Sequence, residues 1–196
     1  FVVSGDAAGI QRKALTTVDQ TRRLAELNFK NVTVPATARL GDEGAASAAI
    51  ARTLDLAAIA LAAEQVGGAQ RCLDMSVAYA NERVQFGRAI GSFQAIKHKC
   101  ADLMVKVESA RSAAYYAACA VAEGNDAEIN TVAPLAKAYC SDAYFQSAAD
   151  CLQIHGGVGF TWEYDVHLYF KRAKSTESLL GDASYHREQL AQRIDL

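Results

Sequence analysis

Apolar residues recur at spacings of three and four along most of the chain after residue 45, the pattern of helices that bury one face. The first such stretch, residues 45–83, contains no proline and is rich in alanine and leucine. A second runs through residues 93–122 and ends at a strong stop, Glu123-Gly124-Asn125-Asp126. We therefore expect two long helices, with the chain reversing at Gly87 and Gly91 between them.

Three further helices are predicted beyond this stop. The first begins near Thr131, a suitable N-cap, with Pro134 in its first turn, where the missing N–H costs little, and a Gly-Gly pair ends it. Residues 163–178 and 182–194 read as two shorter helices, the second capped by Asp182. Amphipathic helices joined by short turns predict an antiparallel helical bundle and a mainly α fold class.

The first 37 residues follow a different pattern, because short strand-like runs alternate with turns there until Pro35 ends the pattern. These runs are Phe1-Val2-Val3, Thr16-Thr17-Val18, Arg23 to Lys30 and Asn31 to Val34. A sheet of at most four strands cannot bury one of its faces alone. We therefore expect residues 1–37 to be the tail of a truncated β-domain and residues 38–196 to form the bundle. The start has no initiator Met and no signal-like pattern, which suggests a piece of a longer chain.

Composition narrows the class of protein. Hydrophobic residues make up 51 % of the chain and the formal charge is -2, which argues against nucleic acid or an anionic membrane as the main partner. No apolar run looks long enough to span a bilayer, since Glu64 and Gln65 interrupt the most apolar stretch. The 5 cysteines show no metal-ligand spacing and are expected to be reduced core residues, which favours a cytoplasmic protein without a metal site.

The joint between the two long helices carries more chemistry than a turn needs. It offers side-chain donors and apolar anchors in alternation, namely Arg83, Gln85, Phe86, Arg88, Ile90, Phe93 and Gln94. On spacing alone, a solvated helix connection pinned by hydrophobic residues is the simpler interpretation.

The order of residues in this joint resembles a motif of the acyl-CoA dehydrogenases, flavoproteins that oxidise the α,β carbon–carbon bond of an acyl thioester. The matching residues are Glu82-Arg83-x-Gln85-Phe86-Gly87-x-x-Ile90-x-x-Phe93-Gln94. A second stretch is similar to the Gln-x-x-Gly-Gly-x-Gly-Phe motif of the same family: Gln153-Ile154-His155-Gly156-Gly157-Val158-Gly159-Phe160. Two independent motifs in the right order, with helical sequence between them, make this resemblance specific.

The resemblance implies FAD as cofactor, bound across a subunit interface. Arg83 would reach the FAD pyrophosphate of a neighbouring subunit, where the planar guanidinium fork matches phosphate oxygens. The Gly-Gly stretch would hold the ADP half, because glycines let backbone N–H groups approach closely; His155 is expected to be a packing or ribose-contact residue. The residues expected at FAD are Arg83, Phe86, Phe93, Gln94, Gln153, Ile154, His155, Gly156 and Gly157. Without the family, a helix-end arginine and a glycine stop signal would explain both motifs.

The resemblance also implies an acyl-CoA substrate, of a length the sequence does not set, and an electron-transfer flavoprotein or similar acceptor. The assembly would be a homo-oligomer, or a hetero-oligomer with a related subunit. In either assembly, the motif residues would complete a cofactor site that another subunit shares.

One part of the family pattern is missing. In most members a glutamate before Gly-Thr, in the loop preceding the last helix, takes the α-proton; aligned on Ala173-Lys174, Leu180 stands there. Other members carry this glutamate on the long helix, where this chain has Ala57. Two hypotheses stay open: an enzyme that uses a displaced carboxylate, or a non-catalytic subunit that completes the FAD site of a glutamate-bearing partner. The carboxylates that could stand in, each more simply a solvated or capping group, are Glu64, Glu177 and Asp182.

Overall fold

The computed structural model describes residues 1–196, and most of them are helical, which confirms the mainly α class. The chain divides into two compact units, Phe1–Thr53 and Leu54–Leu196, which are described separately. The boundary expected between residues 37 and 38 falls in a short 3-10 helix, Ala36–Ala38, and stays a prediction.

The first unit contains one antiparallel hairpin of strands β1 (Ile10–Ala14) and β2 (Ala25–Phe29), paired from Ile10 opposite Phe29 to Ala14 opposite Ala25. The expected strand at residues 23–30 is therefore present. Strand β1 went unpredicted because its sequence, Ile-Gln-Arg-Lys-Ala, is mostly polar.

The other expected strands do not form. Residues 16–18 belong instead to a turn around Asp19, whose carboxylate accepts the backbone N–H and hydroxyl of Thr21 at 2.9 and 2.6 Å. Residues 31–34 open with Asn31 in the left-handed region, at φ 52°, which ends the extended backbone. Residues 1–3 have no strand partner in the sheet.

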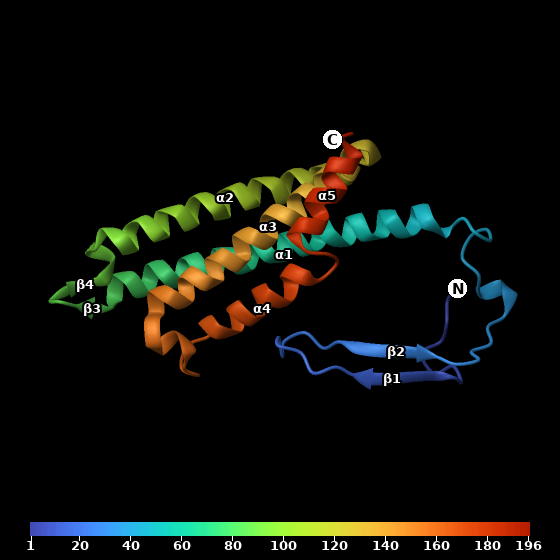
Figure 1. Cartoon of the computed structure of the whole chain (residues 1–196), viewed down its shortest axis with the longest axis horizontal. Helices are drawn as coiled ribbons and strands as arrows, with labels where there is room; N and C mark the ends of the chain where they lie inside the picture. Colours follow the sequence, from blue (N-terminus) through green and yellow to red (C-terminus); the bar gives the residue numbers. More distant parts are fainter. The chain divides into compact units, whose positions relative to one another are not determined.

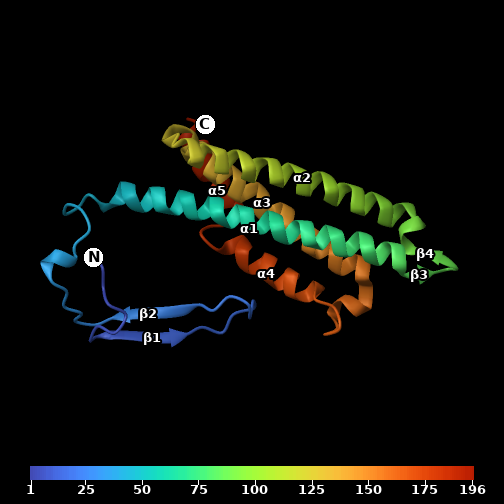
Figure 2. The same cartoon turned by 180° about the vertical axis from the view of Figure 1, so that it is seen from behind.

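The two long helices form as predicted. Helix α1 covers Ala46–Glu82 without interruption, and α2 covers Gln94–Glu123, ending at Gly124 in the left-handed conformation. Between them lie the very short strands β3 (Val84–Gln85) and β4 (Arg88–Ala89) and a 3-10 turn, Ile90–Ser92. The bundle is completed by α3 (Asp126–His155), a 3-10 segment (Gly156–Phe160), α4 (Val166–Ser178) and α5 (Ala183–Arg193). Figures 1 and 2 show α2 and α3 running alongside α1 within the bundle.

Helix α3 begins earlier than expected. Its N-cap is Asn125, whose side chain accepts the Glu128 N–H at 3.2 Å, so Thr131 is not the cap and Pro134 lies inside the helix. A proline there leaves the carbonyl of Asn130 without its usual N–H partner. The Arg193 side chain donates to this carbonyl at 2.7 Å and to Asp55 at 3.0 Å, so an arginine of α5 compensates for the proline.

The core consists of small residues packed between α1, α2 and α3, with α4 over one end of it. The inward stripe of α2 is buried from Leu103 to Ala120, whereas Ile96 and Cys100 are only half-buried. Helix α1 continues through Gly67-Gly68: a Cβ at Gly68 would lie 2.3 Å from the ring of the buried Tyr144, so this glycine makes room for packing.

Helix α1 passes the length and composition test for a membrane span, with a mean hydropathy of 1.5 over an 18-residue window that is 28 % buried. The expectation that no apolar run is long enough is therefore wrong on length and composition. One such helix is weak evidence for a span, because core helices pass the same test.

All 5 cysteines are free, as expected. Cys72, Cys140 and Cys151 are buried in the core, but Cys100 is half-buried and Cys119 is exposed, so the expectation that all of them are core residues is wrong for these two.

Candidate functional site

The joint between α1 and α2 is a tight hairpin rather than an open loop. Phe86 and Gly87 form its tip with φ values of 54° and 76°, and the Ile90 N–H donates to the Arg83 carbonyl at 2.8 Å. Gly91 lies against α1, where an added Cβ would stand 2.8 Å from the carbonyl of Ala80. The backbone of this motif is therefore fixed by its own hydrogen bonds and by close packing on α1.

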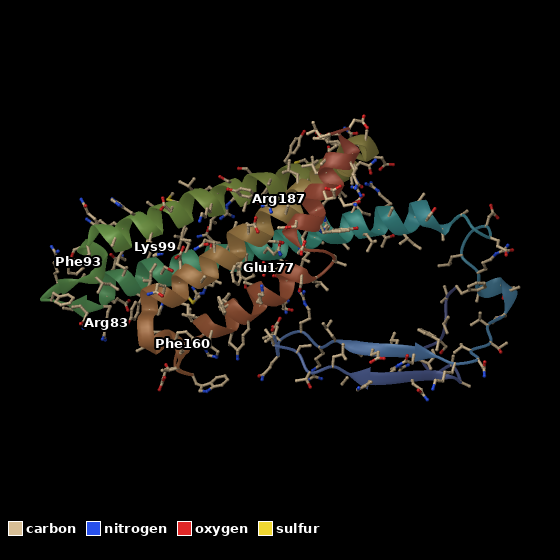
Figure 3. The ribbon with its side chains drawn as sticks, viewed as in Figure 1. Arg83, Phe93, Lys99, Phe160, Glu177 and Arg187 are labelled. Atoms are coloured by element: carbon tan, nitrogen blue, oxygen red, sulfur yellow. The ribbon has the colours of Figure 1, made fainter.

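The fold brings the two sequence motifs to the same end of the bundle. The ring of Tyr79 stacks on His155 of the second motif, with centroids 4.2 Å apart. One turn later on α1, the Arg83 N–H donates to the Tyr79 carbonyl at 2.8 Å. Tyr164, just before α4, closes the cluster edge-on to both rings. Figure 3 shows Arg83 and Phe160, one from each motif, at this end.

The side chains of the first motif face outward. The Arg83 side chain is exposed and has no hydrogen bond or ion pair within the chain, and Phe86 is 90 % exposed. Phe86 meets Phe93 edge-on at 6.1 Å, and the Arg88 guanidinium lies 4.0 Å above the Phe93 ring. The motif thus presents cations and aromatic surface that the chain itself leaves uncovered.

The N-terminus of α2 adds positive potential at this end. Gln94 is the first helical residue and is exposed, and Phe93 at the N-cap position gives no side-chain cap. The first N–H groups of a helix carry a partial positive charge that favours anions. An uncapped helix start beside Arg83 and Arg88 suits a phosphate group.

The second motif divides into a buried and an exposed part. Ile154 and His155 are 5 % and 6 % exposed, so their side chains support the motif from the core, and the His155 ring nitrogen Nδ1 lies 2.8 Å from the Cys151 carbonyl. Gln153 and Gly157 are exposed. Gly156 needs glycine because its φ is 62°, but Gly157 has an ordinary φ and no atom within 4 Å of an added Cβ. Nothing within the chain requires glycine at position 157, which fits close approach by an outside group.

The two positions where the resemblance places a family base carry apolar side chains. Leu180 is half-buried in the turn between α4 and α5, with a φ of 63°, and Ala57 is half-buried on α1. Neither side chain can accept a proton. Figure 3 shows Glu177, one turn before Leu180, in the middle of the bundle, away from Arg83.

The three stand-in carboxylates all have structural partners. Glu64 pairs with Arg172 at 2.9 Å, and Glu177 pairs with Lys174 at 2.7 Å. Asp182 caps α5 as expected, accepting the Tyr185 N–H at 2.8 Å. Their geometry favours the structural interpretation of each.

The sequence analysis missed a buried polar cluster around this turn. Gln65, Lys137 and His186 are buried, and each donates to a backbone carbonyl between residues 176 and 181. Burial lowers the pKa of Lys137 to about 8, against the nearby carboxylates of Asp182 and Glu177, and burial also lowers the pKa of His186. Gln65 and Lys137 lie on helix faces that are otherwise mostly apolar. This interruption of the apolar pattern could have indicated them from the sequence.

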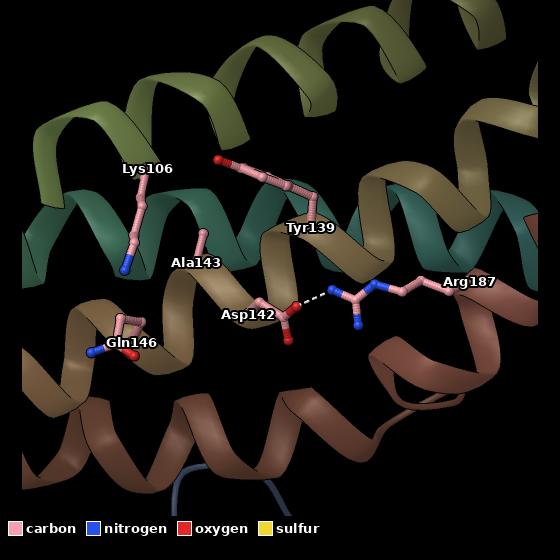
Figure 4. Close-up of a pocket in the computed structure, with 6 residues that line it drawn as sticks. All are labelled: Lys106, Tyr139, Asp142, Ala143, Gln146 and Arg187. Atoms are coloured by element: carbon pink, nitrogen blue, oxygen red, sulfur yellow. Dashed lines mark hydrogen bonds and ion pairs between the residues drawn. The ribbon is translucent and has the colours of Figure 1, made fainter. Parts of the chain in front are cut away.

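A separate surface pocket of about 230 Å³ lies between α2, α3 and α5, and Figure 4 shows its lining. The Arg187 guanidinium pairs with the Asp142 carboxylate there. The residues that line it are Lys106, Tyr139, Asp142, Ala143, Gln146 and Arg187. The pocket contains none of the predicted cofactor or base residues.

Comparison with known proteins supports the family that the two motifs indicate. The sequence model "Acyl-CoA dehydrogenase, C-terminal domain" matches residues 44–195. The acyl-CoA dehydrogenase IpdE2 of Mycolicibacterium smegmatis is 43 % identical, over 97 % of this chain and 59 % of that protein. The butyryl-CoA dehydrogenase structure from Megasphaera elsdenii superimposes with a TM-score of 0.94 at 33 % identity, covering 100 % of this chain and 51 % of that one. The ChsE4-ChsE5 complex from Mycobacterium tuberculosis gives 0.90 at 30 % identity, covering 98 % and 51 %.

The chain therefore belongs to the acyl-CoA dehydrogenase family, whose members depend on FAD. It spans 51 % to 59 % of the length of these three relatives, and the matched domain is the helical bundle. The exposed Arg83, the uncapped α2 and the open space at Gly157 fit an anionic cofactor at this end.

Proposed function

We propose that the chain forms part of an FAD-dependent acyl-CoA dehydrogenase that introduces a double bond between the α and β carbons of an acyl thioester, with FAD bound across a subunit interface. One observation carries the proposal. The two family motifs meet at one end of the bundle through the Tyr79–His155 stack, and the Arg83 side chain there has no partner within its own chain.

Each exposed motif residue has a distinct role toward the cofactor. Arg83 would hold phosphate oxygens of the cofactor with its guanidinium, and the uncapped start of α2 would add backbone N–H groups. Gly157 leaves room for close approach of the ADP half, and the amide of Gln94 donates or accepts as the cofactor requires. Phe86 and Phe93 cover apolar surface and exclude water.

When bound, FAD supplies the acceptor for the hydride that leaves the β carbon. The α-proton must go to a general base within hydrogen-bond reach. Leu180 and Ala57 cannot act as that base, so the proton must be held by a displaced carboxylate or by a residue of another subunit.

A second candidate function has an observation in its favour: the chain is a non-catalytic subunit that completes the FAD site of a glutamate-bearing partner. Glu64 and Glu177 are ion-paired and Asp182 is a helix cap, so each displaced carboxylate already serves the fold. The similarity to a solved complex of two different proteins, ChsE4-ChsE5, supports a heteromeric assembly. The electron acceptor would be an electron-transfer flavoprotein or similar protein, and a cytoplasmic location stays a prediction.

Sedimentation with flavin detection tests the shared-site proposal. The full-length protein is purified alone and together with a glutamate-bearing homologue, and the flavin absorbance is followed across the sedimenting species. We expect flavin to sediment with an oligomer, homomeric or heteromeric, because the unpaired motif residues need a second subunit opposite them. A clean monomer that retains flavin would contradict the proposal.

A further inference from the structure

The turn after α4 is held by side chains from three other helices. The last carbonyls of a helix have no partner within it and need capping groups from elsewhere. At this turn the donors come from α1, α3 and α5. Gln65 donates to the Thr176 carbonyl at 3.2 Å, and His186 donates to that of Leu180 at 3.0 Å. Lys137 donates to the carbonyls of Glu177 and Gly181 at 3.2 and 3.0 Å.

Lys137 is at the centre of this arrangement. Its side chain is 0 % exposed, and its ammonium group makes three contacts for its three N–H donors, the third being to the Ser141 hydroxyl at 2.9 Å. The same hydroxyl lies 3.0 Å from the Gln65 amide nitrogen, which joins the two donors in one network. Lys137 forms no ion pair, so backbone and hydroxyl dipoles, rather than a carboxylate contact, compensate its charge.

The backbone that Lys137 holds is strained. Leu180 has a φ of 63° and Gly181 a φ of 102°, and the left-handed region disfavours a leucine because its Cβ crowds the following carbonyl. Such a conformation persists only where surrounding contacts enforce it. Here, the carbonyls of both left-handed residues accept buried side-chain donors.

We propose that Lys137 is a positioning residue whose buried ammonium caps α4 and, through the carbonyls of Glu177 and Gly181, holds the turn that keeps Leu180 left-handed. His186 binds the carbonyl of Leu180 itself, and Gln65 binds that of Thr176. All of the bonds that reach the turn go to its backbone carbonyls, so the turn directs the side chain at position 180 independently of which residue stands there. The link between position 180 and the acyl site rests on the proposed function, whereas the role of Lys137 in holding the turn does not.

The electrostatics of the surrounding groups agree with this role. Facing Lys137 are Asp182 and Glu177 at the turn and Asp142 on its own helix, whose charges favour the ammonium, while burial disfavours it. His186 is a cationic neighbour only when protonated, and Lys137 together with burial lowers its pKa. At neutral pH the lysine is therefore charged and the histidine neutral, so both can donate to carbonyls.

Amide hydrogen exchange tests the proposal on the full-length protein without flavin or substrate, so its outcome is separate from that of the proposed function. In Lys137→Met, which keeps an unbranched side chain but removes the ammonium, we expect the amides of Gly181, Tyr185 and His186 to exchange about ten-fold faster, with α2 changing less than two-fold. The matched control is Lys174→Met, which removes an exposed lysine of α4 and should leave these amides unchanged.

The pattern of exchange separates positioning from simple core packing. A uniform rise across the bundle, or no change at the turn, would overturn the proposal. If Lys137→Met does not fold, Ser141→Ala replaces it, since this variant keeps the ammonium and removes one of its three acceptors. The same local increase, smaller in size, is then expected, and its absence would also overturn the proposal.

Discussion

The end of the bundle that carries Arg83 and the turn that carries Leu180 differ in whether their polar groups are exposed or buried. At the first, Arg83 and Gln94 lie exposed beside an uncapped helix start. At the second, the polar groups of Lys137 and His186 are buried and bound to backbone carbonyls. Under the proposed function, the first region needs a group from outside the chain, whereas the polar groups of the second find their partners within the chain.

The largest effect is expected from restoring a carboxylate at the turn. Because the turn is held through its backbone, Leu180→Glu should place a general base where the family has one, without rebuilding the loop. General bases contribute about 10²-fold or more to rate, so acyl-CoA oxidation by the FAD-loaded Leu180→Glu protein, measured with an artificial electron acceptor, should exceed that of Leu180→Gln by about that factor. Leu180→Gln is the control, because glutamine has nearly the same shape as glutamate but cannot act as a general base. Equal rates for the two variants would show that position 180 does not face the acyl site.

A smaller effect is expected at the exposed end. Arg83→Ala removes a charge-assisted contact of about 1.5 to 3 kcal/mol, so the assembled protein should lose flavin about ten-fold or more readily on dialysis. Arg71→Ala, an exposed arginine on the same helix, should retain flavin as the wild type does. Unchanged flavin content in Arg83→Ala would mean that this motif has no cofactor role here.

Substitutions at two glycines distinguish contact with the cofactor from packing within the chain. Gly157→Ala should leave the thermal unfolding midpoint nearly unchanged, because the added methyl group meets no atom of the chain, but should weaken flavin retention several-fold. Gly68→Ala should instead destabilise the fold by about 1 to 3 kcal/mol, because its methyl group would overlap Tyr144. Flavin titration and thermal unfolding of both variants check this. If Gly157→Ala bound flavin normally, position 157 would not be a contact site.

The buried turn should also make stability depend on pH. His186 binds protons less readily in the folded state, so the unfolded state takes up more protons below about pH 6.5 and the free energy of unfolding should fall there. The Lys137 pKa of about 8 in the folded state lies below its ordinary value near 10.4, so stability should rise between about pH 8 and 10. Urea unfolding across this range measures both slopes. Lys137→Met should not show the rise in stability at alkaline pH. A rise of unchanged size in that variant would mean that another group causes it.

Periodicity predicted α1 and α2 well because each buries one face at regular spacings, whereas α3 is buried on most of its sides. The ends of α2 and α3 and the Asp182 cap carry local signals that the structure uses as expected. The start of α3 was predicted wrongly because Pro134 is compensated by Arg193, a residue 59 positions away that no local pattern reveals.

The candidate site was predictable where it carries a motif and not where it depends on burial. Both family motifs were found from their residue order, and the structure added that Tyr79 joins them. Lys137 and His186 carry no motif, and their partners are backbone carbonyls of a turn that only the folded chain brings near. Polar residues on apolar helix faces are therefore the feature to examine when no motif is present.

The most direct test of the account is an activity assay with and without a partner. The full-length protein is loaded with FAD alone, and acyl-CoA oxidation is followed with an artificial electron acceptor before and after a glutamate-bearing homologue is added. We predict no turnover by the lone protein and turnover on mixing, since under the proposed function this chain supplies part of an FAD site while Leu180 and Ala57 cannot act as a base. Robust turnover by the lone protein, abolished by Glu64→Gln, Glu177→Gln or Asp182→Asn, would contradict the account and identify the displaced base.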